Sequence, residues 1–144
     1  EEYQAFLQPG GNARLAALLN AQRKQLGCRI YQLEFTDTEK TKPFAFSGIE
    51  ALHKAGFQQP PASEYRLVRD EMLYCAKGEP DLAVLERVFD RYNGKLPADY
   101  PGRGVAPSDV LELYDAEKRR YYYRDMKQFV PVAFSPLLAR PIQK

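Results

Sequence analysis

The sequence predicts an α+β fold, a small mixed or mostly antiparallel sheet with two or three helices packed on it. Helix-like and strand-like segments alternate early in the chain, and strand-like segments follow one another later. A doubly wound sheet would instead need helices between successive strands throughout. The 144 residues, 44% of them hydrophobic, suit a single domain with one core.

The first predicted elements are a helix and a strand. Leucines at helical spacing predict a helix over residues 13–26, which Gly27 would end. Residues 28–35 predict a strand with one buried face, because large apolar side chains recur there with a period of two. These side chains are Tyr31, Leu33 and Phe35.

A short helix and a long strand follow. Ser47 and Glu50 have the spacing of a capping box, in which both side chains satisfy free N–H groups at a helix start, and Gly56 would end this helix. Residues 64–74 predict a strand. Its apolar positions change phase near Arg69, which indicates a bulge or bend.

The last predicted elements are a helix, a loop and three strands. An apolar stripe predicts a helix over residues 80–93. Residues 95–107 contain three Pro and two Gly, which is too irregular for a simple turn and indicates an ordered functional loop. A hairpin is predicted from residues 110–114 and 121–125, and a final strand over residues 129–134.

Composition limits the partners and the compartment. A formal net charge of +2 gives little long-range attraction to nucleic acid, which is a possible but not a favoured partner. No stretch approaches the ~20 apolar residues of a membrane span, so we predict no membrane partner. Cys28 and Cys75 lack the spacing of a redox or metal motif and are interpreted as reduced packing residues, which favours a cytoplasmic location.

No residue set predicts a metal, a cofactor or a reaction. His53 is the single His of the sequence, and it lies in a short predicted helix far from a persuasive nucleophile. One His and two separated Cys fall short of a zinc site. Gly102 and Gly104 resemble a phosphate-binding loop only superficially, because the Lys-Ser/Thr pair is missing. We therefore predict no metal and no cofactor, and favour a protein without enzymatic activity.

A carboxylate-dependent enzyme is one alternative. It would need Asp99, Asp109 and Asp125 to converge for metal binding or acid–base chemistry. Asp in loops more often caps a turn by accepting backbone N–H bonds, and Asp109 after Ser108 suits that role.

A nucleic-acid-binding module that uses the basic, tyrosine-rich hairpin is the other alternative. Rings beside cations can stack on the bases of a single strand. Side chains alternate along a strand, however, so Tyr122 and Arg124 would share one face and Tyr123 the other. This pattern is typical of a strand with one covered and one wet face.

Several short motifs occur in a characteristic order. They are Ile30-Tyr-Gln-Leu33, Tyr65-Arg-Leu-Val68, Tyr92-Asn93, Pro97-Ala-Asp-Tyr100, Ser108-Asp-Val110, Tyr123-x-Asp125 and Phe129. In their order and spacing the chain resembles the YodL-like domain family from about Cys28 to Val132. The resemblance implies a small bacterial cytoplasmic domain, often within larger proteins of mobile genetic elements, with no established enzymatic activity. Where the family pattern has His and Ser after the loop glycine, this chain has Arg103 and Gly104.

The resemblance also suggests how the chain is divided. Residues 1–27 would form an N-terminal helix or linker segment, residues 28–134 the YodL-like α+β domain, and residues 135–144 a Pro-containing tail.

These observations favour a non-enzymatic protein-interaction module with an unidentified protein partner. The long loop and the many tyrosines support it, because Tyr and Arg are enriched at interfaces. The candidate contact residues are Tyr100, Arg103, Tyr122 and Arg124. The residues predicted to shape the loop are Asn93, Gly102, Ser108, Asp109 and Asp125.

Overall fold

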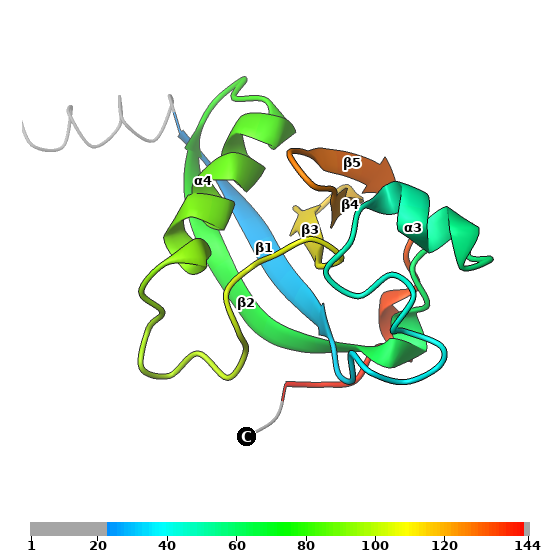
Figure 1. Ribbon diagram of the computed structural model, residues 1–144. Coiled ribbons are helices and arrows are strands. Elements are labelled where there is room, and N and C mark those ends of the chain that lie inside the picture. Colours follow the sequence, from blue (N-terminus) through cyan, green and yellow to red (C-terminus); the bar gives the residue numbers. More distant parts are fainter. Residues whose placement is uncertain (1–22, 143–144) are drawn as a thin grey trace, which may run out of the picture.

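One antiparallel sheet of five strands forms the centre of the fold (Figure 1). The computed structural model describes residues 23–142. The strands lie in the order β2-β1-β3-β4-β5, and every pairing is antiparallel, in agreement with the predicted α+β class. Helix α3 (Ile49–Lys54) lies between β1 and β2 in sequence, and α4 (Asp81–Asn93) lies between β2 and β3. The strands are β1 (Arg23–Leu33), β2 (Tyr65–Ala76), β3 (Val110–Tyr114), β4 (Arg119–Arg124) and β5 (Phe129–Val132).

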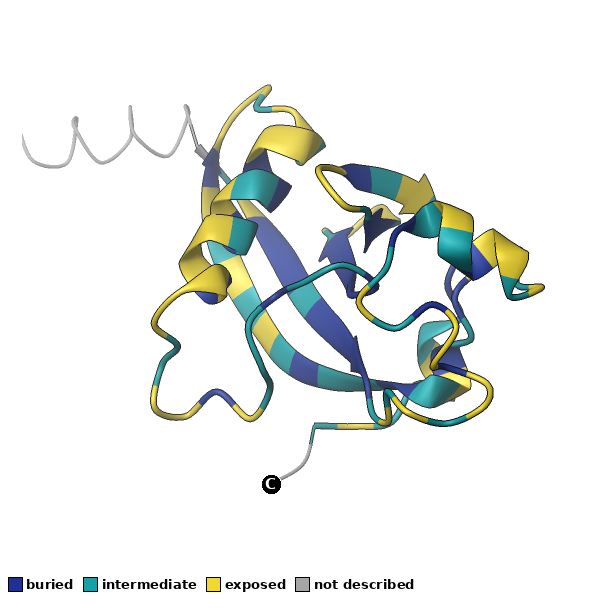
Figure 2. Cartoon of the chain, in the orientation of Figure 1, coloured by how far each residue is buried: buried dark blue, intermediate teal, exposed yellow. Residues whose placement is uncertain are grey.

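Each face of the sheet contributes to a buried core, because a layer packs on each side, although the face of β2 opposite α4 stays exposed at Met72 and Tyr74. Helix α4 and the loop after it cover one face, and the segment around α3 covers the other together with Phe134. The interior strand β1 therefore contributes Cys28 and Ile30 to the first core and Tyr31 and Leu33 to the second, and Figure 2 draws it dark blue over much of its length. The prediction of one buried face was wrong, since the local pattern does not reveal that a second layer covers β1.

Strand β1 also begins earlier than predicted. The predicted helix over residues 13–26 is wrong in its last turn, where Arg23 pairs with Ala76 of β2 and Leu26 pairs with Leu73. Pairing with β2 and burial of Leu26, which is 1% exposed, override the helical spacing of the leucines. The rest of this predicted helix lies outside the described residues.

Strand β2 contains the predicted irregularity. The register against β1 shifts between Ile30, which faces Arg69, and Tyr31, which faces Leu67. Val68 is therefore the extra residue of a β-bulge, and its side chain packs into the core on the α4 side. The predicted bend near Arg69 is confirmed.

Helix α4, the loop and the hairpin follow the predicted pattern. The helix ends at Asn93, directly before Gly94. The residues between α4 and β3 form no regular helix or strand. Strands β3 and β4 pair as the predicted hairpin, and β5 follows but is shorter than the predicted strand over residues 129–134.

Helix α3 begins without the predicted capping box. Its N-cap is Gly48, and the Ser47 hydroxyl donates to Ala45 O over a long 3.4 Å. The free N–H of Ile49 instead donates to Asp125 Oδ1, 3.1 Å away, from the turn after β4. The capping-box prediction was wrong because a carboxylate distant in sequence takes the place of the local hydroxyl.

Asp125→Ala is expected to lower the free energy of unfolding by about 1 kcal/mol, the usual cost of a lost helix cap. Ser47→Ala is the matched control and is expected to change it by less than about 0.5 kcal/mol, because the Ser47 hydroxyl makes only one long hydrogen bond and does not cap α3. Urea unfolding of both variants measures the difference. A larger loss in Ser47→Ala would contradict the assignment of the cap to Asp125.

The C-terminal segment packs along the sheet as far as the start of β2. The Phe134 ring lies 4.8 Å from the Tyr31 ring and 5.5 Å from the Tyr65 ring, measured between centroids. After a short 3-10 turn, η2 (Pro136–Leu138), Arg140 forms an isolated parallel bridge with Arg66. Only the first residues of β2 are covered by this segment.

The two cysteines are free and buried, as their interpretation as packing residues predicts. Burial raises the pKa of Cys28, so its thiol stays protonated and unreactive. Within residues 23–142, no helix combines the length and the apolar character needed to cross a membrane. In the same range, no three His, Cys, Asp or Glu side chains gather in a way that could hold a metal ion.

Candidate functional site

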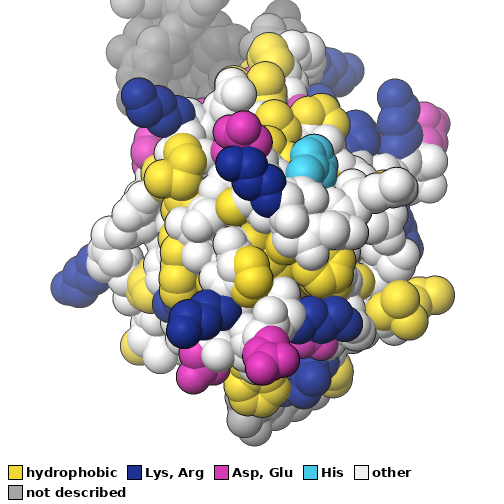
Figure 3. All heavy atoms as spheres, turned by 45° about the vertical axis from the view of Figure 1, so that its right-hand side comes forward, with side chains coloured by type: hydrophobic (Ala, Val, Ile, Leu, Met, Phe, Trp, Pro, Cys, Tyr) yellow, Lys and Arg dark blue, Asp and Glu magenta, His cyan; other side chains and the backbone are white. Residues whose placement is uncertain are grey.

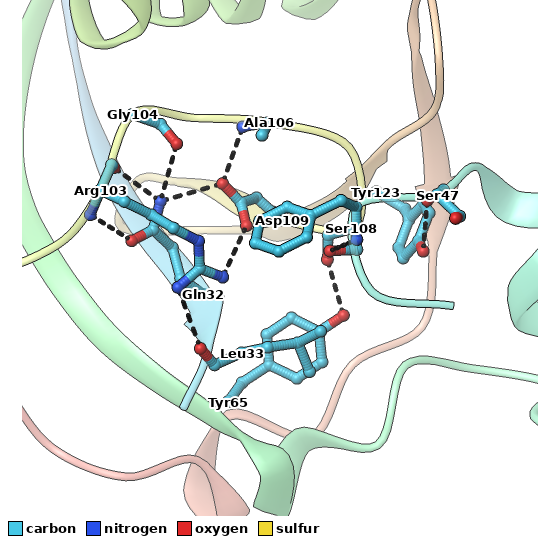
Figure 4. Close-up of polar contacts among 11 residues, drawn as sticks. Gln32, Leu33, Ser47, Tyr65, Arg103, Gly104, Ala106, Ser108, Asp109 and Tyr123 are labelled. Carbon is cyan, nitrogen blue, oxygen red and sulfur yellow. Dashed lines mark hydrogen bonds and ion pairs between the residues drawn. The ribbon is translucent and has the colours of Figure 1, made fainter. Parts of the chain in front are cut away.

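A polar network ties the loop after α4 to the C-terminal end of β1 (Figure 4). The side chain of Gln32 on β1 donates from Nε2 to Arg103 O and to Asp109 Oδ2, both at 2.9 Å. Its Oε1 accepts a hydrogen bond from Arg103 N at 3.0 Å. Asp109 Oδ2 also accepts from Ala106 N at 2.9 Å, and a Cβ at Gly102 would collide with Gln32 Oε1. One buried amide therefore holds this part of the loop against β1.

Asp109 is a fully buried carboxyl group. Burial raises the pKa of Asp109 to about 7, although Arg103 and the hydrogen bonds from Ala106 and Gln32 act in the opposite direction. Among the described residues its Oδ1 has no hydrogen-bond partner, and Arg103 Nη2 is 3.8 Å away. The guanidinium is instead turned toward Leu33 O, to which Nη1 donates at 3.2 Å. Asp109 thus changes protonation near neutral pH.

The end of the loop meets the segment before α3 in an unusual backbone conformation. Ser108 and Phe46 have φ angles of 80° and 58°, in the left-handed region that side-chain-bearing residues seldom adopt. Ser108 Oγ accepts from Phe46 N at 3.1 Å, and Ser108 O accepts from Tyr65 OH at 2.7 Å. Tyr123 OH donates to Ser47 O at 3.0 Å. These bonds hold both strained residues in place.

The loop also returns to the end of α4. Val105 N donates to Tyr92 O at 2.9 Å, and a Cβ at Gly104 would lie 3.2 Å from the same oxygen and 3.8 Å from Asn93 Cα. Asn93 itself is exposed. The other residues predicted to shape the loop take part in the network or cap α3. They are Gly102, Ser108, Asp109 and Asp125.

Three of the four predicted contact residues are buried. Tyr100, 8% exposed, stacks on Tyr92 with ring centroids 5.2 Å apart. Tyr122, 9% exposed, donates to Asp81 Oδ2 of α4 at 2.6 Å. Arg124, 6% exposed, lies against two phenylalanine rings, one on α4 and one on β5. The structure thus brings Tyr122 and Arg124 together against α4, whereas the partly exposed Arg103 lies in the loop network.

Acidic residues of α4 pair with the cations of the tyrosine-rich hairpin. Arg120 and Arg124 each form an ion pair with an acidic side chain of this helix. On the face drawn in Figure 3, Lys and Arg side chains lie among acidic and hydrophobic ones without forming one continuous patch. Tyr122 and Tyr123 do face opposite sides of the sheet, but both are buried. The predicted wet face of this strand is therefore wrong at its C-terminal end, where layers cover both sides.

The three loop carboxylates make separate contacts. Asp99 is exposed and pairs with Arg69, with an N–O distance of 3.3 Å. Asp109 lies in the network with Gln32, and Asp125 caps α3. Each of the three carboxylates thus has its own partner in another part of the structure.

A groove lies between β2 and α4, and the sequence did not indicate it. It has a volume of about 310 Å³. Leu73 of β2 and the buried Val84 and Val88 of α4 supply apolar surface. Arg87 and Arg91 of α4 line it as well, and both are exposed. Met72 and Tyr74 of β2 complete the lining.

The outer edge of β2 beside this groove is unpaired within residues 23–142. Strand β2 is the last strand on its side of the sheet. The contact with Arg140 uses only Tyr65 O and Leu67 N, and the turn after the strand uses the N–H and C=O of Ala76. The backbone N–H and C=O groups of successive strand residues point to opposite sides of the strand. Because the groups of Ala76 point away from β1, those of every second residue before it do so as well. These residues are Asp70, Met72 and Tyr74.

Large apolar side chains are exposed next to this free edge. Met72 is 56% and Tyr74 63% exposed. Both occupy alternate positions of a strand whose other side is covered by α4. An exposed Met and Tyr at alternate positions is a weak signal, and sequence reasoning missed it because nothing local identifies β2 as an edge strand.

Comparison with known proteins identifies one relationship. The model of the family described as the YodL-like domain matches residues 27–134, which are most of the chain. This range includes β2, α4, the groove between them and the Gln32 network. No curated protein and no solved structure matches the chain.

Proposed function

The chain belongs to the YodL-like domain family, and from this premise we propose that it is a protein-interaction module that binds an extended segment of another polypeptide along the edge of β2. One observation carries the proposal: within the described residues, the unpaired edge of β2 borders a groove whose other wall is α4. A strand added there would gain backbone hydrogen bonds from β2 and side-chain contacts from α4.

The two edge strands of the sheet, β2 and β5, differ in how well they can pair with another chain, and this difference supports the proposal. Strand β5 has four residues and contains Pro131, and short edge strands with proline resist pairing with other chains. Strand β2 has twelve residues, no proline and two exposed apolar side chains. A long edge with exposed apolar side chains is a liability unless a partner uses it, and the β-bulge at Val68 interrupts only the first part of this edge.

For the biological setting, we propose a bacterial cytoplasmic domain within a larger protein of a mobile genetic element. The resemblance of the motifs to the family supports the bacterial source and the setting within a larger protein of a mobile genetic element. The free, buried Cys28 and Cys75 are typical of a reducing compartment.

The proposal predicts that ten-residue peptides selected from a random library bind at the edge of β2. The backbone amide NMR signals of Asp70, Met72 and Tyr74 are expected to shift most on binding. Met72→Pro is expected to weaken binding at least about tenfold, because proline removes an N–H that points away from β1 and distorts the pairing edge. Calorimetric titration of each variant gives the affinities.

Met72→Ala is the matched control, because it keeps the N–H and is expected to weaken binding less than Met72→Pro. A second test leaves the protein unchanged and methylates the backbone nitrogens of every second peptide residue. Methylation of one alternate set should abolish binding and methylation of the other set should not, because only one set of N–H groups faces β2. The largest NMR shifts in the loop around Tyr100 and Arg103, with affinity insensitive to Met72→Pro, would overturn the proposal.

A further inference from the structure

We infer that the polypeptide recognised at the β2 edge is an acidic strand, in which carboxylate side chains alternate with apolar ones. This inference rests on the proposed strand addition and adds the chemistry of the partner. It follows from the charge of the groove, from the spacing of two arginines on α4 and from the exposed side chains on the other face of β2.

Arginine is the only charged residue type in the lining of the groove. Its lining residues include two arginines and no Asp or Glu. Arg91 is exposed and forms no ion pair with any residue from 23 to 142. Arg87 pairs with Glu79 at 3.1 Å, but its side chain keeps 55% exposure and can accept a second carboxylate. Bound acidic side chains would therefore form charge-assisted hydrogen bonds with both guanidinium groups.

The spacing of the two arginines matches that of a strand. Arg87 and Arg91 are four residues apart on α4, which places their Cβ atoms ~6 Å apart on one face of the helix. Alternate side chains of a strand are ~6.6 Å apart on one face. Two carboxylates at positions i and i+2 of the added strand could therefore meet one arginine each.

The other face of the added strand would lie beside exposed apolar side chains. Its intervening residues point away from α4, where Met72 and Tyr74 would be their cross-strand neighbours. Tyr74 is held by a hydrogen bond from Gln25 Nε2 to its hydroxyl, at 3.1 Å. Apolar residues at these positions would cover surface that is otherwise left in water.

A basic or neutral strand fits less well. It would remove Arg91 from water without supplying an opposite charge, and burying an unpaired charge is costly, whereas Arg87 would keep its ion pair with Glu79. The added strand is therefore expected to be selected by charge as well as by its backbone.

The test uses three synthetic peptides of equal length. They are Gly-Ser-Glu-Val-Glu-Val-Glu-Ser-Gly, the same peptide with Lys in place of Glu, and a blocked peptide with the order Glu-Glu-Glu-Val-Val. The alternating Glu peptide is expected to bind at least about tenfold more tightly than either of the others, because only it combines the charge with the alternation. Calorimetric titration at two salt concentrations is the measurement.

Arg91→Glu is expected to reverse the preference between the Glu and Lys peptides. Arg119→Glu makes the same change of net charge at an exposed position on β4 and is expected to alter it by less than about twofold. Binding that needs the β2 edge but ignores Arg91→Glu would overturn the acidic selectivity and leave strand addition intact. If the wild-type protein bound none of the three peptides, the inference that an acidic strand binds at β2 would be overturned. A dimer of the chain that Met72→Pro dissociates would overturn it as well, because a second copy would then occupy the β2 edge.

Discussion

Gln32→Met is expected to lower the free energy of unfolding by about 3 kcal/mol or more. Methionine keeps the length and nearly the volume of glutamine, so the substitution removes hydrogen bonds without opening a large cavity. Arg103 N and Arg103 O would lose a partner at a partly buried position, and the buried Asp109 Oδ2 would keep only the hydrogen bond from Ala106 N. Each buried polar group left without a partner costs about 1–3 kcal/mol, and the effects combine because the groups share one network.

Urea unfolding measures this loss, and hydrogen exchange at the Arg103 and Ala106 amides reports whether the loop is released. Gln25→Met provides a matched control, because it makes the same chemical change on the same strand at an exposed glutamine. We expect the control to lose less than about 0.5 kcal/mol. Equal losses in the two variants would show that the Gln32 amide does not hold the loop.

Asp109→Asn is expected to remove a pH dependence of stability that the wild-type protein has between about pH 4 and 7. The folded pKa of Asp109, about 7, lies above the ordinary value of 3.8. In this window the folded protein binds the proton more strongly than the unfolded chain. The stability contributed by Asp109 is therefore fully present below about pH 4 and is lost as the pH rises through about 7. The loss is on the order of 4 kcal/mol, from about 1.4 kcal/mol for each pKa unit.

Urea unfolding of both proteins from pH 4 to 8 tests this prediction. The difference in unfolding free energy, wild type minus variant, is expected to fall as the pH rises. Glu34 has a lowered pKa because of its hydrogen bond with Arg66, but its effect is common to both proteins and cancels. A difference that stays constant or rises with pH would mean that Arg103 keeps Asp109 ionised in the folded protein.

Asp115→Asn serves as a control of opposite sign. The backbone N–H groups of Glu117 and Lys118 lower the pKa of Asp115. Its contribution to stability is therefore present above its unfolded pKa and is lost as the pH falls. The wild-type advantage over this variant should grow only as the pH rises toward about 4 and stay nearly constant from pH 4 to 8, whereas the effect of Asp109 falls across that range.

Several elements could be predicted because their signals are local. Helix α4 ends where Asn93 and Gly94 interrupt an apolar stripe, and the β3–β4 hairpin has polar residues between two apolar runs. The bulge at Val68 appears in the sequence as a change of phase. In each case, residues close in sequence determine the backbone conformation.

Other elements depend on contacts between distant segments. Leu26 follows a helical pattern, but pairing with β2 makes it a strand residue. Ser47 has the spacing of a helix cap, but the carboxylate of Asp125 accepts the hydrogen bond from Ile49 N at the start of α3. Whether a strand is buried on one face or on both depends on the layers that pack against it. Local periodicity does not encode those layers.

The sequence by itself determined the family, the α+β class and the presence of an irregular loop that contains Gly102, Ser108 and Asp109. Only the tertiary structure decided what that loop contacts and which strand lies at the edge of the sheet. It buried Tyr100, Tyr122 and Arg124 in internal contacts, and it brought Gln32 against Asp109. It also left β2 at the edge of the sheet beside α4. Strand order depends on long-range pairing, whose free energy is shared among residues far apart in the chain, so no single segment of sequence specifies it.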